Sequence, residues 1–507
     1  MTRARLGLAL TIIGASGCLL LFAASCAGGV RVPGLRVTSF EPLRWWALVL
    51  AAGLWLRPPK WSAGRVFAGA VAAAVAYSVL YKLGRYYSFN AVAFDLTIFE
   101  SVLRSELDGR GSHALLLGRS LFSEHFEPVV LLFVPLYRLA SSSLTLMLAQ
   151  ALAVPLAAVP LYRAGKALGL LDAPAAVVGG AWLVNAAAWQ AHAVDFHPES
   201  FAPLFVFWAF DCSLRRRWLR FAIAVALSLS VKEEMALVMA CFALLVLRGE
   251  GRRWPFALAT LAVSVAWGVI CFRWVMPAFR PATVDAAGGH VLAWRWAHLG
   301  GSFSEMALHV ALRPGYLLGL LVTRPALELF GSVGFVALLD PFALVAALPE
   351  LWAHLASSYG LEAELGSYYG VLPVMLCFPA VLGAVRRVQE RAGERLALLV
   401  AAVALCAHPR PMMLDRVEGG LAAERAVRAI GEDEPVCVQN AIAPHRTPSL
   451  KLRFAPDCGD AKWLITAEKR ECFPLDAGQC ARLAAQAELV SRDGPVSVWK
   501  TPPATAE

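Results

Sequence analysis

Ionisable side chains stand beside long apolar runs in four short stretches of the sequence. They are AFDLTIFE at 93–100, EHFEP at 124–128, DFHPES at 195–200 and SVKEEM at 230–235. Charged groups at membrane depth are costly and usually face an interior cavity or one another. Carboxylates and imidazoles transfer protons and hold metal ions, and an ammonium binds phosphate. The pattern therefore predicts one polar site where these stretches meet.

Asp95 is the candidate catalytic base. It begins a segment whose apolar residues would form one stripe along a helix, namely Leu96, Phe99, Leu103 and Leu107. Such a stripe predicts a helix that lies flat in the membrane interface and holds Asp95 at headgroup depth. The alternative is that Asp95 only caps this helix, a frequent role of aspartate. The two roles are compatible, because a capping carboxylate keeps one oxygen free.

Four residues are candidate ligands of a divalent metal such as Mg²⁺ or Mn²⁺: His125, Asp195, His197 and Glu199. Neutral imidazole and carboxylate suit such ions. Pro198 favours an extended backbone at His197, which would turn alternate side chains of DFHPE to one face. The alternative is that both histidines are hydrogen-bonded interfacial residues.

Candidate contacts for a phosphate or another part of a substrate are Lys232, Arg119, Glu233 and Glu100. An ammonium is a good point-charge partner of phosphate. The alternative for residues 232–234 is a charged hairpin tip between two short apolar runs. Tyr368 and Tyr369 are expected to be interfacial aromatic residues.

Composition places these residues in a polytopic membrane protein. Apolar residues make up 58% of 507 and charged residues 16%, and the mean hydropathy is +0.59. Soluble domains carry about 25% charged residues. The net charge of +9 comes from short basic clusters between apolar runs, which is how orientation in a bilayer is set. Without a basic stripe or a nucleic-acid-binding motif, nucleic acid is not an expected partner.

The apolar runs predict an all-α membrane domain of about 12–14 transmembrane helices. Residues 1–65 would hold N-terminal helices, with 6–27 as a retained helix or, alternatively, a signal peptide. Residues 66–408 would form the membrane core, with an outer loop at 84–127. The apolar run 128–140 is short and contains Pro135, so it is either re-entrant or an extra crossing. Basic clusters at 163–166, 215–220 and 386–391, among others, should be cytoplasmic, which places the outer loop outside.

Residues 409–507 form a more polar tail, which the same alternation places on the outside. It contains Cys437, Cys458, Cys472 and Cys480, which suit two disulfides with three possible pairings in an exported domain. A zinc site is the alternative, although no CxxC spacing supports it. We expect a small α/β domain with strands at 436–440 and 462–467 and a helix at 478–490.

The order of motifs resembles an uncharacterised bacterial membrane family, the domain of unknown function 2079. The resemblance covers roughly residues 70–470 and rests on FDLTIFE, EHFEPVVLLFVPLY, LTLMLAQAL, VDFHPESFA, SVKEE and ALPELWAHLASSYG. The family commonly has His–Tyr where this chain has Tyr368–Tyr369. It looks like a distant relative of the GT-C glycosyltransferases, which are polytopic and use polyprenyl-phosphate-linked sugars.

This resemblance implies a base at Asp95, in the place of the acidic residue of the first large outer loop. The expected activity is transfer of a sugar from a polyprenyl phosphate to an acceptor, on the extracytoplasmic face of the bacterial cytoplasmic membrane. The other partners would be membrane lipids. Alternative functions are a transporter or flippase for a lipid-linked or anionic substrate, which usually carries charges near the midplane, and a non-catalytic membrane scaffold.

Overall fold

The computed structural model describes most of the chain. The described residues are 2–26, 30–32, 35–37, 43–56, 62–91, 93–248, 251, 253–280, 293–364, 367–407, 414–415, 420–431, 434–446, 448, 451–455, 458–467, 482–494 and 496–501.

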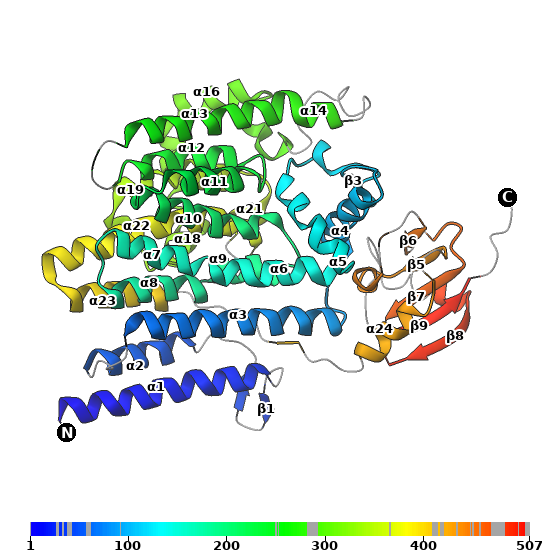
Figure 1. Ribbon diagram of the computed structural model, residues 1–507, viewed down its shortest axis with the longest axis horizontal. Coiled ribbons are helices and arrows are strands. Elements are labelled where there is room, and N and C mark those ends of the chain that lie inside the picture. The colour runs from blue at the N-terminus through cyan, green and yellow to red at the C-terminus, as the bar shows by residue number, and fades with distance from the viewer. Residues whose placement is uncertain are drawn as a thin grey trace.

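The membrane part is a stack of helices whose axes run in roughly one direction (Figure 1). Its longest helices are apolar, with few charged residues inside them. The helices are α1 (Arg3–Cys26), α2 (Leu43–Leu56), α3 (Ala63–Tyr87), α6 (Ser143–Leu156), α7 (Ala158–Ala167), α8 (Asp172–Val184), α9 (Ala186–Ala193), α10 (Ala202–Leu214), α11 (Trp218–Leu229), α12 (Met235–Val246), α13 (Trp254–Ile270), α14 (Met276–Phe279), α22 (Val371–Ala392) and α23 (Glu394–Cys406). A short hairpin, β1 (Val30–Val32) and β2 (Leu35–Val37), lies between α1 and α2.

Five segments are long and apolar enough to cross a membrane: Ala4–Leu21, Ala63–Tyr87, Ser143–Ala167, Trp254–Phe279 and Tyr368–Ala392. Four shorter apolar helices accompany them among the described residues. The all-α polytopic fold is therefore confirmed, whereas the number of about 12–14 crossings stays a prediction.

The apolar runs 316–339 and 341–356, which the sequence predicts as two of the transmembrane helices, are not continuous helices. They consist of α17 (Pro314–Leu320), α18 (Arg324–Gly331), η6 (Val336–Leu339), α19 (Pro341–Val345) and α20 (Leu348–Leu355). Prolines open α17, α18, α19 and α20, and Phe335 takes a left-handed conformation with φ of 57°. Proline supplies no N–H and favours the first turn of a helix. The hydropathy of these runs does not show where the helices break. The short helices α16 (Phe303–Leu312), α21 (Gly360–Ala363), η5 (Ala293–Leu299) and η7 (Tyr368–Gly370) lie beside them in sequence.

The outer loop holds α4 (Ala93–Leu107), the hairpin β3 (His113–Ala114) and β4 (Arg119–Ser120), and η1 (Leu121–Ser123). The apolar stripe of α4 faces the protein, since Leu96 and Leu103 are fully buried in the core. The stripe therefore packs on protein and not on lipid, and the position of α4 at the membrane interface stays a prediction. The run after it forms η2 (Pro128–Phe133) and α5 (Val134–Leu139), which together span about 20 Å and are too short to cross the roughly 30 Å apolar layer.

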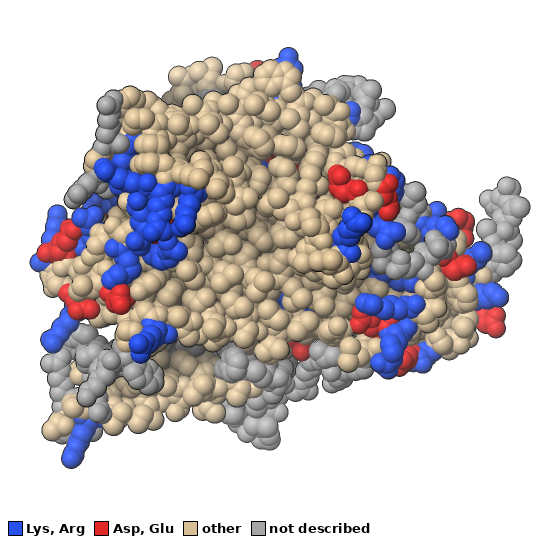
Figure 2. All heavy atoms as spheres, in the orientation of Figure 1, with Lys and Arg blue, Asp and Glu red and all other residues tan. Residues whose placement is uncertain are grey.

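The two ends of the helix stack differ in charge. Lys and Arg side chains gather at the end where α22 meets α23, and the tail domain lies at the other end (Figures 1 and 2). Two fully buried aspartates fix the basic end. Asp211 pairs with Arg163 and Arg215, and Asp340 pairs with Arg248 and Arg387. The first set ties α7 to α10, and the second ties the end of α12 and α22 to the residue before α19.

The tail folds as a mixed five-stranded sheet with the strand order β6-β5-β7-β9-β8. Its elements are α24 (Gly420–Arg428), β5 (Val436–Val438), η8 (Ala443–His445), β6 (Leu452–Phe454), β7 (Trp463–Ala467), β8 (Glu488–Asp493) and β9 (Val496–Lys500). β5 is parallel to β6 and β7, and β9 is antiparallel to β7 and β8. The strands expected at 436–440 and 462–467 are confirmed. The expected helix 478–490 is wrong at its end, because 488–490 belong to β8.

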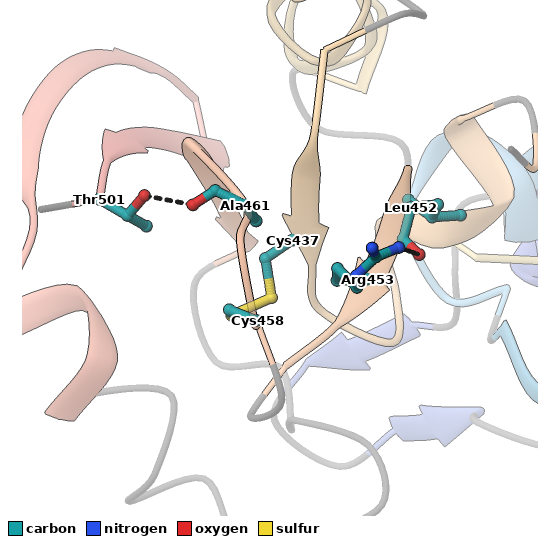
Figure 3. Close-up of a disulfide and its surroundings, with 6 residues drawn as sticks. All are labelled: Cys437, Leu452, Arg453, Cys458, Ala461 and Thr501. Atoms are coloured by element: carbon teal, nitrogen blue, oxygen red, sulfur yellow. Dashed lines mark hydrogen bonds between the residues drawn. A yellow bond between two sulfur atoms is a disulfide. The ribbon is translucent and has the colours of Figure 1, made fainter. Parts of the chain in front are cut away.

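One disulfide, Cys437–Cys458, joins β5 to the connection between β6 and β7 (Figure 3). Near it, the Thr501 hydroxyl donates to the carbonyl of Ala461 at 2.5 Å and so ties the end of β9 to that connection. Because the disulfide uses both sulfur atoms, Cys437 and Cys458 cannot be ligands of the alternative zinc site. The other two tail cysteines, Cys472 and Cys480, lie outside the described residues.

Candidate functional site

Asp95 and His197 form a contact pair at the open edge of the site. Asp95 lies in the first turn of α4 and not at its N-cap. Its Oδ2 is 3.2 Å from His197 Nε2, and its side chain is 42% exposed while that of His197 is 9% exposed. The ring of Tyr368 lies against the imidazole, with a centroid distance of 3.9 Å. The carboxylate is thus accessible, while the imidazole that orients it is held in place.

The backbone before His197 is fixed by two membrane helices. Lys82 of α3 donates to the carbonyls of Val194 and Asp195 at 2.5 and 3.1 Å. Gln150 of α6 donates to the carbonyl of Val194 at 3.0 Å and accepts from the N–H of His197 at 2.9 Å. His197 itself is extended, with φ of −145° and ψ of 132°, as expected before a proline.

A group of charges lies behind this pair, which we call the Lys232 cluster: Lys232, Glu127, Glu199, Glu233 and Glu234. All are buried except Glu234, whose side chain is 34% exposed. Lys232 Nζ is 2.5 Å from Glu199 Oε1 and 3.6 Å from Glu234 Oε1. It lies in the turn between α11 and α12, and Glu199 lies in the first turn of η3 (Pro198–Phe201). Burial lowers the pKa of Lys232, but the surrounding glutamates outweigh it and raise that pKa well above its usual value. Lys232 is therefore a permanent cation.

Glu233 links the cluster to His125. His125 Nδ1 is 2.8 Å from Glu233 Oε1, and the N–H of Phe126 donates to Glu233 Oε2 at 2.9 Å. Burial would raise the pKa of Glu233, but His125 and Lys232 outweigh it and bring the pKa to about 2. Burial would also raise the pKa of Glu199, but the charge of Lys232 outweighs it and brings that pKa to about 2. Both carboxyl groups are therefore ionised.

Glu127 differs from its neighbours. Burial, reinforced by the charge of Glu199, raises its pKa well above the usual value. Its Oε2 and the Oε2 of Glu199 are buried without a hydrogen-bond partner in the part of the chain that the structure describes. The cluster thus combines one cation with four acids, and burial disfavours the ionised form of Glu127.

The four candidate metal ligands are brought into one region, but each has its own partner. His125 pairs with Glu233, His197 with Asp95, and Glu199 with Lys232, while Asp195 pairs with Arg85 at 2.6 Å. Among the described residues, no group of three or more His, Cys, Asp or Glu side chains is placed to hold a metal ion. A divalent ion here stays a prediction, and its binding would require these pairs to rearrange.

Two of the candidate substrate contacts lie apart from the cluster. Arg119, in β4, pairs with Glu124. Glu100 is one and a half turns beyond Asp95 on α4 and accepts hydrogen bonds from Tyr137 and Ser143. It lines a separate cavity that faces the tail. Glu100 is close to Asp95 in the sequence and on the same helix, but its side chain points to this cavity and not to the Lys232 cluster.

Sequence reasoning missed a second polar group next to the cluster. His354 Nε2 is 3.0 Å from Glu350 Oε1, both on α20, and Glu350 acts electrostatically on Glu234. Arg295 pairs with Glu362 and lies over the ring of Tyr369 at 5.8 Å. The spacing of four between Glu350 and His354 puts both on one helix face and was the available signal. Nothing comparable marks Arg295.

The four stretches that build the site lie inside a region shared with known sequences. The family described as "Predicted membrane protein (DUF2079)" matches residues 85–408, which is more than half of the chain. The chain belongs to this family. The resemblance read from the sequence motifs is therefore confirmed. No curated protein matches the sequence.

Among solved structures, the chain is similar to the apo form of ArnT from Cupriavidus metallidurans. The two share 14% sequence identity and a TM-score of 0.45, over 86% of this chain and 98% of that one.

Proposed function

We propose that this protein is a GT-C-type glycosyltransferase that moves a sugar from a polyprenyl phosphate to an acceptor hydroxyl. The acceptor oxygen attacks the anomeric carbon with inversion, and the bond from that carbon to the phosphate oxygen breaks. The hydroxyl proton passes to Asp95, and polyprenyl phosphate leaves. A lipid-linked donor fits a site that is built at the ends of membrane helices.

The observation that carries the proposal is the Asp95–His197 pair. A base must reach its substrate and must also be oriented. At 42%, Asp95 is more exposed than the side chains of the Lys232 cluster given above, and it lies 3.2 Å from the imidazole of His197. Tyr368 packs against this imidazole, and Gln150 holds the backbone N–H of His197. Asp95 does not act as the N-cap of α4, which was the alternative role, because it lies inside the first turn of that helix.

The two candidate phosphate contacts differ from the base in that both already have partners. Lys232 and Arg119 are both already paired with carboxylates, Glu199 and Glu124. A departing phosphate would therefore compete with these carboxylates. Charge stabilisation by Lys232 stays part of the proposal.

The proposed orientation follows from the two ends of the helix stack. Basic side chains gather at the end opposite the tail (Figure 2), and the positive-inside rule assigns that end to the cytoplasm. α10 and α22 each run from the site to this basic end. The site and the tail are therefore proposed to face the extracytoplasmic side of the bacterial cytoplasmic membrane.

The test is transfer by membranes that contain the chain, with radiolabelled sugars on polyprenyl phosphate as donors. Asp95→Asn should lower release of polyprenyl phosphate at least about 100-fold, because general-base catalysis contributes that much. The matched control is Asp108→Asn, just beyond α4, where an exposed aspartate pairs with Arg104 and Arg110. It should keep activity within about twofold. Equal activity of Asp95→Asn and wild type would reject the proposal.

A further inference from the structure

A polar cavity of about 170 Å³ lies between the membrane core and the tail. Tyr86 comes from the end of α3, Glu100 from α4, Ser141 and Ser142 from the turn before α6, and His445 from η8 of the tail. A single buried water needs only about 10–15 Å³. The cavity therefore has room for a small polar molecule.

His445 is the most informative residue of this cavity. It is 4% exposed, and among the described residues its ring makes a weak hydrogen bond with the Tyr86 backbone but no well-aligned one at either nitrogen. Its ring packs between Tyr86 and Phe89, with centroid distances of 4.1 Å to each. Burial lowers the pKa of His445 to about 3, although the Tyr86 backbone partly opposes this. The ring is therefore neutral and offers one donor and one acceptor.

The carboxyl group in the cavity is also close to neutral. Glu100 is 1% exposed, and burial raises its pKa to about 8, against the opposing effect of the hydrogen bonds from Ser143 and Tyr137. A protonated carboxyl group both donates and accepts. Ser141 donates its hydroxyl proton to the carbonyl of Tyr137 at 3.1 Å and still offers an acceptor, whereas Ser142 accepts from the N–H of Leu144 at 3.2 Å and can still donate.

The cations at the cavity are already engaged. Arg428 pairs with Glu424 at 2.6 Å. Arg446 donates to the backbone carbonyls of Val427, Ile430 and Gly431. Selection of an anion would need positive charge directed into the cavity, whereas the groups that line it are mostly neutral donors and acceptors.

We propose that this cavity binds one sugar ring, whose hydroxyls both donate and accept and so match His445, Glu100 and the two serines. Buried polar groups without partners are costly, and a polyhydroxyl ligand would satisfy both nitrogens of His445. The ring is that of a free saccharide or of a glycan. This binding goes beyond the proposed transfer and does not use Asp95.

The test is saturation-transfer NMR on the full chain in nanodiscs without glycoside detergent. The probes are methyl glycosides of glucose, galactose, mannose, arabinose and N-acetylglucosamine. At least one should bind saturably, and His445→Phe should weaken it at least about tenfold, because the ring stays but both polar atoms are lost. His445→Gln, which restores a donor and an acceptor, should recover part of the affinity. If His445→Phe does not fold, Ser141→Ala takes its place and should weaken binding severalfold.

Two control variants separate this site from other effects. His192 is likewise buried, with no well-aligned hydrogen bond at either ring nitrogen among the described residues, but the cavity beside it is only about 10 Å³. His192→Phe should leave saccharide binding unchanged. Asp95→Asn should bind as wild type does even though transfer is lost.

Three results would overturn the inference. They are the absence of saturable binding for every glycoside, wild-type affinity in both His445→Phe and Ser141→Ala, and displacement of the bound glycoside by inorganic phosphate. The last would show that the cavity is an anion site.

Discussion

At the scale of single residues, Lys232 is the charge on which the site depends. It is buried among four glutamates, and Glu199 lies 2.5 Å away. Removal of one partner of a buried ion pair leaves an uncompensated charge and costs about 3–5 kcal/mol. Lys232→Met should therefore lower the free energy of unfolding by that amount, measured as a lower midpoint of thermal unfolding in nanodiscs.

The control for this prediction is Lys166→Met. Lys166 Nζ lies 2.7 Å from Asp172 Oδ1, and both side chains are at least one third exposed. Such surface pairs contribute about 0–1 kcal/mol, so this variant should stay near wild type. Adding Glu199→Gln to Lys232→Met should recover part of the lost stability. If Lys232→Met is as stable as Lys166→Met, the cluster is not held by this cation.

The sequence predicted which residues gather at the site but not how they pair. Pro198 correctly indicated the extended backbone at His197. The partner of His197 is Asp95, which is 102 positions earlier in the chain. Spacing within one stretch gives no information on which distant carboxylate faces an imidazole. The expected metal set shows the same limit, because Asp195 turned out to face Arg85.

At the scale of elements, α4 positions both Asp95, in the candidate active site, and Glu100, in the separate cavity that faces the tail. Glu100 has a folded-state pKa of about 8, raised by burial, against an ordinary value of 4.5. The folded state thus binds the proton more tightly than the unfolded state. The stability that this proton contributes is complete below about pH 4.5 and is lost as the pH rises through about 8.

The docking of α4 should therefore weaken with rising pH, and Glu100→Gln should remove this dependence. Gln mimics the protonated carboxyl group in size and lacks the titration. We expect the thermal midpoint of the variant, relative to wild type, to increase steadily between pH 5 and 9. A difference that stays constant over this range would mean that Glu100 does not take up a proton on folding.

The helical spacing of apolar residues predicted that α4 exists. It did not predict whether those residues contact lipid or protein. The same stripe would serve a helix in the lipid interface or one packed in protein, and Leu96 and Leu103 are packed in protein. The broken helices of 314–355 show a related limit. Apolar runs indicated membrane depth, whereas Pro325, Pro341 and Pro349 determine where the helices begin.

At the scale of the whole molecule, the tail is a separate sheet domain at the site end of the helix stack (Figure 1). Its disulfide closes a loop with a sequence separation of 21 residues, and loops of this length gain about 3 kcal/mol from the bond. Replacement of Cys437 and Cys458 together by Ser should lower the thermal midpoint of the tail transition. A reducing agent should lower this thermal midpoint in wild type and should leave that of the variant unchanged.

This result bears on topology as well as stability. Disulfides form in exported compartments, and the outward placement of the tail was predicted from basic clusters alone. Wild type isolated under thiol-blocking conditions should carry the Cys437–Cys458 bond. Recovery of both as free thiols would place the tail in the cytoplasm and reverse the proposed orientation of the site.

The most direct test of the central claim is a double-mutant cycle on the Asp95–His197 pair, read as transfer from the lipid-linked donor. Asp95→Asn should lose at least about 100-fold in rate, and His197→Ala should lose about tenfold or more because the base is no longer oriented. The double variant should be no slower than Asp95→Asn, since the two residues act as a unit. Wild-type rates in Asp95→Asn, or losses that multiply in the double variant, would contradict the account.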